Sequence, residues 1–136
     1  MIEPTITKFE NVMIIDDNVI DLYIASRMIT KNNFGNNVIA YTKAQEALDY
    51  LQDNQNNEVA LPQIIFVDIY MPIMSGFDFL KFYNELPEKL KNYCHVYVLS
   101  STIDDYDIIR ASTDVNIISF QVKPITKDFL DQINQF

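Results

Sequence analysis

Cysteine is nearly absent from the sequence, which contains only Cys94 in 136 residues. One cysteine cannot form an intrachain disulfide, and it cannot supply a zinc site built from four cysteines. A chain without disulfides is typical of a reducing compartment. We therefore expect a cytoplasmic protein.

Glycine, proline and long apolar runs are also scarce. The chain has two glycines and five prolines, and aromatic residues make up 12% of it, which excludes general disorder. No apolar run approaches the roughly 18 residues of a membrane span, and the polar N-terminus does not resemble a signal peptide. A chain of 136 residues with 49% hydrophobic residues instead suits one domain with a sizeable core.

Basic residues are outnumbered, with 10 lysines and arginines against 19 aspartates and glutamates and a formal charge of -9. Such a surface repels nucleic acids and anionic lipids, so we expect no direct nucleic-acid partner and no membrane partner. The excess of acid has two explanations. It serves solubility alone, or some of the carboxylates converge on a cation.

The apolar pattern switches repeatedly between short continuous runs and helical spacing. Continuous runs are typical of strands that are covered on both faces, as in a parallel sheet. The expected strands cover residues 12–15, 38–40, 64–67, 96–99 and 117–122. Helices are expected after Asn18, Thr42, Ser75, Thr102 and Thr126, and the polar segment 54–62 is expected to be a loop.

Several helix ends have recognisable signals. Thr42 with Gln45, and Ser75 with Asp78, have the spacing of capping boxes. Asn33 with Gly35 is expected to end the first helix, and the last helix is expected to carry residues 129–136. Alternating strands and helices predict an α/β fold with a five-stranded parallel sheet and helices on both faces.

Polar residues follow four of the five expected strands. The first strand ends in Asp16-Asp17, the third in Asp68, the fourth in Ser100-Ser101 and the fifth in Lys123. Parallel sheets bind ligands outside the carboxyl ends of their strands, so these side chains are expected at one edge. Two carboxylates about 4 Å apart repel by roughly 4 kcal/mol at an effective dielectric near 20. A shared cation offsets this repulsion, and oxygen ligands suit Mg²⁺ better than zinc.

Each of these residues also has a simpler interpretation. Asp17 could cap the following helix, Ser100 could be an ordinary loop residue, and Lys123 could be a solvated surface lysine. Their occurrence together at independent strand ends favours a single site.

The ordered set of motifs resembles a response-regulator receiver domain from end to end. The resemblance rests on Asp16-Asp17, on Asp68 followed by Met71-Pro72 and Gly76, on Ser100, and on Lys123-Pro124 with Phe120 three residues earlier. It implies a (βα)5 flavodoxin-like receiver fold over residues 1–136, without an output domain, as in a single-domain regulator of two-component signalling.

The resemblance also implies a chemistry. Asp68 would accept a phosphoryl group from a sensor histidine kinase or a histidine phosphotransfer protein, with Mg²⁺ as cofactor. Asp17 would bind Mg²⁺ directly and Asp16 through water, and Asp68 and the backbone carbonyl of Tyr70 would complete the protein ligands. Lys123 would pair with phosphate oxygens, and Ser100 would donate its hydroxyl to one of them. Such a protein catalyses only its own phosphorylation and dephosphorylation.

Signalling would then follow from a change in packing. The movement of Ser100 toward the phosphate would leave room for Phe120 to turn inward. This switch would reshape the face formed by the fourth helix, the fifth strand and the fifth helix, to which an unknown protein target would bind. Serine replaces the family's more usual threonine at position 100. Tyr70 and Thr102 occupy positions that tune the access of water to the acyl phosphate in this family.

Two other interpretations stay open. One is a degenerate receiver that acts as an interaction module without phosphorylation, although the loss of Asp17, Asp68 or Lys123 that would mark it is not seen. The other is an Mg²⁺-dependent phosphatase with an aspartate nucleophile. That class places the nucleophile after the first strand with a second aspartate two residues later, whereas Asp16 and Asp17 are adjacent.

Overall fold

The computed structural model of the protein describes residues 6–135 and contains one five-stranded parallel sheet in the order β2-β1-β3-β4-β5. The strands are β1 (Phe9–Ile15), β2 (Gly35–Tyr41), β3 (Ile64–Asp68), β4 (His95–Ser100) and β5 (Ile117–Val122). This is the α/β fold with a five-stranded parallel sheet that the sequence predicts, and all strand pairs are parallel.

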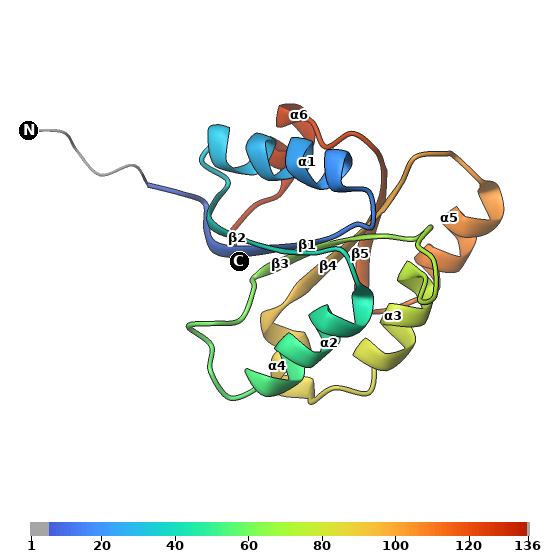
Figure 1. Ribbon diagram of the computed structural model, residues 1–136, viewed down its shortest axis with the longest axis horizontal. Helices are drawn as coiled ribbons and strands as arrows, with labels where there is room; N and C mark the ends of the chain where they lie inside the picture. Colours follow the sequence, from blue (N-terminus) through green and yellow to red (C-terminus); the bar gives the residue numbers. More distant parts are fainter. Residues whose placement is uncertain (1–5, 136) are drawn as a thin grey trace, which may run out of the picture.

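Helices cover both faces of the sheet, with α1 and α6 on one face and α2, α3 and α4 on the other (Figure 1). The helices are α1 (Val19–Lys31), α2 (Ala44–Asp53), α3 (Gly76–Tyr83), α4 (Glu88–Tyr93), α5 (Asp105–Ser112) and α6 (Lys127–Gln132). The short helix α4 was not predicted, so the helix between β4 and β5, expected as the fourth, is α5.

The continuous apolar runs of the strands contribute side chains to two hydrophobic clusters, one on each face of the sheet. Along β1, Val12 and Ile14 pack with α1 and α6, whereas Met13 and Ile15 pack with α2 and α3. Successive side chains of a strand point to opposite faces, so a strand covered on both faces must be apolar at every position. Strand β3 is consequently buried along its whole length, and β1 is buried at every position except Glu10.

Most helix starts agree with the sequence. Asn18 caps α1 by accepting hydrogen bonds from Ile20 N and Asp21 N, so Asp17 is not the cap. Ser75 and Asp78 form the expected capping box of α3, and Thr126 caps α6.

Two expectations about helix ends were wrong, and a third was right only in part. Thr42 does not cap α2, because the N-cap position is occupied by Lys43, which makes no side-chain capping bond. Helix α1 ends at Lys31, and Asn33 terminates it as expected, with a left-handed φ of 55° and a hydrogen bond of 3.0 Å from Phe34 N to Ile29 O. Gly35 takes no part in this helix end, because it is the first residue of β2. Helix α6 ends at Gln132 and not beyond it, and Phe136 lies outside the described residues.

Candidate functional site

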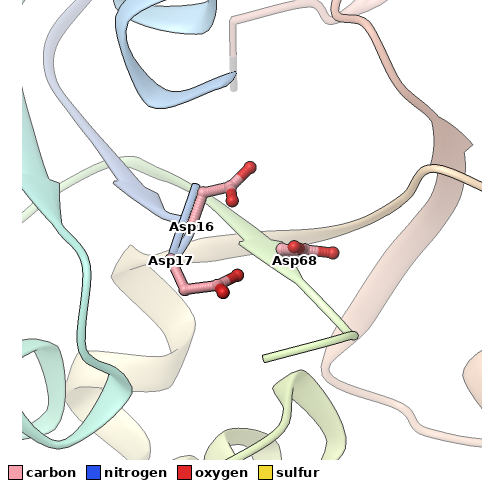
Figure 2. Close-up of side chains that lie close together, drawn as sticks. All are labelled: Asp16, Asp17 and Asp68. Atoms are coloured by element: carbon pink, nitrogen blue, oxygen red, sulfur yellow. The ribbon is translucent and has the colours of Figure 1, made fainter. Parts of the chain in front are cut away.

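Three aspartates meet at the carboxyl edge of the sheet. Asp16 and Asp17 follow β1 and Asp68 ends the neighbouring strand β3, and one carboxylate oxygen from each lies within 4.8 Å of the others. Figure 2 shows the carboxylates of Asp16 and Asp17 directed toward Asp68. Asp16 and Asp68 are buried, whereas Asp17 is exposed to solvent. The structure therefore brings these strand-end carboxylates together at one edge of the sheet, as the sequence predicts.

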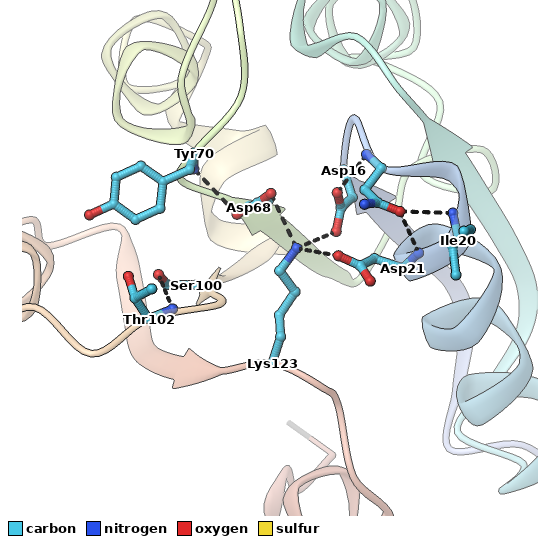
Figure 3. Close-up of polar contacts among 9 residues, drawn as sticks. Asp16, Ile20, Asp21, Asp68, Tyr70, Ser100, Thr102 and Lys123 are labelled. Atoms are coloured by element: carbon cyan, nitrogen blue, oxygen red, sulfur yellow. Dashed lines mark hydrogen bonds and ion pairs between the residues drawn. The ribbon is translucent and has the colours of Figure 1, made fainter.

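Lys123 brings a positive charge into this cluster from the end of β5. Its Nζ lies 2.8 Å from Asp16 Oδ2, 3.0 Å from Asp21 Oδ2 and 3.2 Å from Asp68 Oδ2 (Figure 3). An ammonium group has three donors, and these three carboxylates accept all of them. Lys123 is thus part of the site and not a freely solvated surface lysine.

Sequence reasoning missed Asp21, which lies in the first turn of α1. Its backbone N–H donates to Asn18 Oδ1, so the N-cap of α1 holds this turn beside the edge of the sheet. The position of Asp21, four residues after Asp17, is the only signal that the sequence offered. The contact of Asp21 with Lys123 depends on how α1 lies relative to the end of β5, and no local sequence pattern shows this arrangement.

Burial and charge shift the pKa values of the site in known directions. Burial raises the pKa of Asp68 and repulsion from Asp16 adds to this effect, while Lys123 opposes it. Burial disfavours the charged form of Lys123, but hydrogen bonds to Asp16 and Asp21 outweigh that effect and raise its pKa. The site therefore favours a charged lysine beside an aspartate whose negative charge is destabilised.

The position of Asp68 is fixed by backbone contacts. Asp68 Oδ1 accepts a hydrogen bond of 3.3 Å from Tyr70 N, and Gly76 N donates to Ile69 O at 3.0 Å. A Cβ atom at Gly76 would lie 2.5 Å from the backbone oxygen of Asp68 and 2.7 Å from Ile69 Cα. Only glycine allows α3 to begin so close to the chain that carries Asp68.

Ser100 ends β4 beside this cluster and is completely buried. Its Oγ accepts a hydrogen bond of 3.2 Å from Thr102 N, and its backbone oxygen accepts one of 2.7 Å from Lys123 N. Phe120 pairs with Val98 across β4 and β5 and is partly buried against the cluster that contains α2 and α3. Phe120 also lines a surface pocket with Ile108 and Ala111 of α5.

Tyr70 connects two parts of the site that the sequence does not place together. Its backbone N–H reaches Asp68, and its hydroxyl donates a hydrogen bond to Asp107 Oδ2 on α5. The hydrogen bond to Asp107 is also the main cause of the raised pKa of Tyr70. Sequence reasoning named the backbone carbonyl of Tyr70 and a position that tunes the access of water, and it missed Asp107.

The donor set of the cluster fits a hard divalent cation. Three carboxylates offer oxygen ligands only, which suits Mg²⁺ and not the nitrogen and sulfur ligands preferred by zinc. The exposed Asp17 leaves one side of the cluster open to water, and Mg²⁺ usually keeps several water ligands.

Comparison with known proteins gives consistent results. A family model described as response regulator receiver domain matches residues 12–134. A two-component response regulator from Arabidopsis thaliana is 33% identical over 127 residues, which are 93% of this chain and 20% of the relative. A transcriptional regulatory protein from Halalkalibacterium halodurans is 25% identical over 126 residues, and the chain spans 51% of its length.

Solved structures share the fold over most of their length. A response regulator receiver protein from Dyadobacter fermentans has a TM-score of 0.81 at 30% identity, covering 89% of this chain and 91% of that one. A two-component response regulator from Cytophaga hutchinsonii has a TM-score of 0.85 at 25% identity, with 91% and 92% coverage.

None of the helices within residues 6–135 has both the length and the hydropathy that crossing a bilayer requires.

Proposed function

The chain belongs to the response regulator receiver domain family, and we propose that Asp68 accepts a phosphoryl group from a phosphohistidine. The observation that carries the proposal is the position of Asp68, buried at the strand edge with Asp16 and Asp17 on one side and Lys123 Nζ 3.2 Å from its Oδ2. The donor would be a sensor histidine kinase or a histidine phosphotransfer protein.

The transfer is a substitution at phosphorus. An oxygen of the Asp68 carboxylate forms the new bond to phosphorus while the bond to the donor imidazole nitrogen breaks, and that nitrogen keeps the electron pair. The negative charge lies on the three phosphoryl oxygens throughout, so catalysis depends on alignment and on nearby positive charge. Lys123 supplies such a charge, because its ammonium can turn from Asp68 to a phosphoryl oxygen.

The carboxylates of Asp16, Asp17 and Asp68, with the backbone carbonyl of Tyr70, would hold Mg²⁺ at this edge. When bound, the ion supplies positive charge that offsets the carboxylates and the phosphoryl oxygens. Asp16 is less available than Asp17, because its Oδ1 accepts from Asn18 N and its Oδ2 from Lys123. This difference supports Asp17 as the direct ligand and Asp16 as a ligand through water.

A protein donor needs a surface beside Asp68, and the N-terminal half of α1 offers one. Val19, Ile20 and Tyr23 expose apolar side chains two to six residues after Asp17. Exposed apolar groups next to a polar site are typical of places where proteins bind. We propose that the phosphodonor docks there.

The signal would leave through α5, β5 and α6. The Ser100 hydroxyl, which now accepts from Thr102 N, would turn to donate to a phosphoryl oxygen, and Phe120 would turn into the space released between β5 and α5. Ile109 and Ile118 are exposed apolar side chains on α5 and β5, which supports a protein target for this surface.

Acetyl phosphate with Mg²⁺ tests the function directly. We expect intact-protein mass spectrometry to detect one added phosphoryl group that is labile to base and to hydroxylamine, as acyl phosphates are. Asp68→Asn should remove the adduct, and a chelator or Asp17→Asn should reduce it strongly. An adduct that persists in Asp68→Asn contradicts the assignment. No adduct on the unsubstituted protein would favour a phosphorylation-independent interaction module, and steady turnover of small phosphate esters would favour a phosphatase.

A further inference from the structure

Tyr70 is bonded at both ends, and its two partners lie on different parts of the molecule. Its backbone N–H donates to Asp68 Oδ1, at the end of β3, and its hydroxyl donates to Asp107 Oδ2, in α5. Figure 3 shows the Tyr70 side chain extending from Asp68 toward the loop that contains Ser100 and Thr102. One residue therefore connects the proposed phosphoacceptor with the helix that precedes β5.

Asp107 is an unusual partner because it is a buried carboxylate. Its exposed fraction is 8%, and no lysine or arginine within residues 6–135 forms an ion pair with it. A buried charge that loses a hydrogen-bond donor is destabilised by the lost solvation. The Tyr70 hydroxyl consequently stabilises the present position of α5.

The loop between β4 and α5 bears on the same contact. Ser100 Oγ accepts from Thr102 N, and two residues later Asp104 caps α5 by accepting from Tyr106 N and Asp107 N. If Ser100 turns to a phosphoryl group, the loop 101–104 loses this anchor and the first turn of α5 is free to shift. The Tyr70 backbone stays beside Asp68 while its N–H donates to Asp68 Oδ1, so a shift of Asp107 would strain the hydrogen bond from the Tyr70 hydroxyl.

We propose that the Tyr70–Asp107 hydrogen bond is a latch that holds α5 in the resting position, with Asp107 as its positioning residue. The inference rests on the proposed function, since the latch opposes the rearrangement that phosphorylation of Asp68 favours. Coupling between two sites is reciprocal, so a change at Asp107 must alter the affinity of the Asp68 site for a phosphoryl mimic.

The experiment measures binding of beryllofluoride with Mg²⁺ by calorimetry, together with amide hydrogen exchange of residues 105–112. Tyr70→Phe removes the hydroxyl and keeps the backbone and the ring. Asp107→Ala removes the acceptor, and Asp107→Asn keeps an acceptor oxygen. Tyr106→Phe is the matched control, because it makes the same chemical change at an exposed tyrosine in the first turn of α5.

We expect Tyr70→Phe and Asp107→Ala each to bind beryllofluoride about 5-fold more tightly or better, the lower end of common coupling strengths. Both should also show faster exchange in α5 without any ligand. The double variant should gain no more than either single variant, since both remove the same bond. Asp107→Asn should be close to the unsubstituted protein, and Tyr106→Phe should not differ from it.

Two results would overturn the latch, and they are distinguishable. If the unsubstituted protein binds beryllofluoride and the Tyr70 and Asp107 variants match it in affinity and in α5 exchange, the hydrogen bond carries no coupling while the proposed function stands. If the unsubstituted protein and the Tyr106→Phe control both fail to bind beryllofluoride, the proposed function fails and the latch with it.

Discussion

Lys123 donates a hydrogen bond of 3.0 Å to Asp21, a carboxylate that lies on α1 and outside the cluster of three aspartates. The ammonium also contacts Asp16 and Asp68, two members of that cluster. Lys123 therefore partly neutralises the place where a divalent cation would bind. Without a bound cation it acts as an internal counterion, and it competes with any cation that enters.

Removal of this counterion should have opposite effects on stability and on cation binding. We expect Lys123→Met to lower the free energy of unfolding by about 2 kcal/mol in a chelator, less than for a fully buried ion pair because the site is partly solvated. The same variant should gain more thermal stability from Mg²⁺ than the unsubstituted protein does, because the ammonium no longer competes. Thermal unfolding across an Mg²⁺ titration measures both effects.

Lys127→Met is the control for this titration, because Lys127 forms an exposed ion pair of 2.7 Å with Asp131, on α6. Exposed ion pairs contribute little to stability, so its response to Mg²⁺ should equal that of the unsubstituted protein. An equal response of Lys123→Met would mean that Lys123 and the cation do not compete.

Ser100→Ala should separate phosphorylation from its consequence. The variant keeps Asp68 and Lys123, so we expect it to accept a phosphoryl group from acetyl phosphate. It lacks the hydroxyl that turns to the phosphate, so most of the beryllofluoride-dependent change in hydrogen exchange of α5 and β5 should disappear. If the amides of α5 and β5 respond as strongly as in the unsubstituted protein, Ser100 is not the trigger for Phe120.

Tyr83→Phe should stabilise the protein. Within residues 6–135, the Tyr83 hydroxyl is buried and has no hydrogen-bond partner, and burial raises the pKa of this group. A buried polar group without a partner is destabilising by about 1–3 kcal/mol. We expect an increase of about 1 kcal/mol in the free energy of unfolding by urea, since the phenyl ring keeps its packing against Phe79.

Tyr50→Phe is the matched control with the opposite sign. The Tyr50 hydroxyl donates a hydrogen bond of 2.6 Å to Ala60 O and so holds the loop 54–62 against α2. Its removal should destabilise the protein by about 1 kcal/mol. If both substitutions change the free energy of unfolding by the same amount and sign, the unpaired hydroxyl of Tyr83 is not the cause of the effect.

The capping box of α3 should add a pH dependence to stability. Hydrogen bonds from the Ser75 backbone and side chain lower the pKa of Asp78 from its ordinary value of 3.8. A lowered pKa in the folded state stabilises the protein above 3.8, and this contribution is lost as the pH falls through the folded-state pKa. Asp78→Asn should therefore lower the melting temperature at neutral pH, and the difference should vanish in acid. A difference that does not depend on pH would contradict this origin.

The sheet was predictable because its strands contain continuous apolar runs. Buried strands such as β1 and β3 leave that signal in the sequence, and the crossover rules then fix the side to which their ends point. Helix α4 left no such signal, since only Leu90 of its six residues is buried. The prediction that Thr42 caps α2 was wrong because the spacing of a capping box shows only which residues are able to cap a helix. It does not show at which residue the helix begins.

The residues of the site also fall into a group that the sequence predicts and a group that it does not. Asp16, Asp68 and Lys123 were predictable because they follow strands whose ends share one edge. Asp21 and Asp107 were not, because their contacts depend on how α1 and α5 lie across that edge. Residues on helices beside a sheet edge escape reasoning based on strand ends, even when they complete the electrostatics of the edge.

The position of Cys94 makes the chain ready for site-specific labelling. This only thiol is buried after α4, and burial raises its pKa to about 12. Thiol reagents act on the thiolate, so Cys94 is protected in the folded protein and becomes reactive only when the core opens. If a second cysteine is introduced on the exposed surface of α5, a thiol-reactive probe would label that cysteine and not Cys94. The movement of α5 could then be followed in a chain with no other substitution.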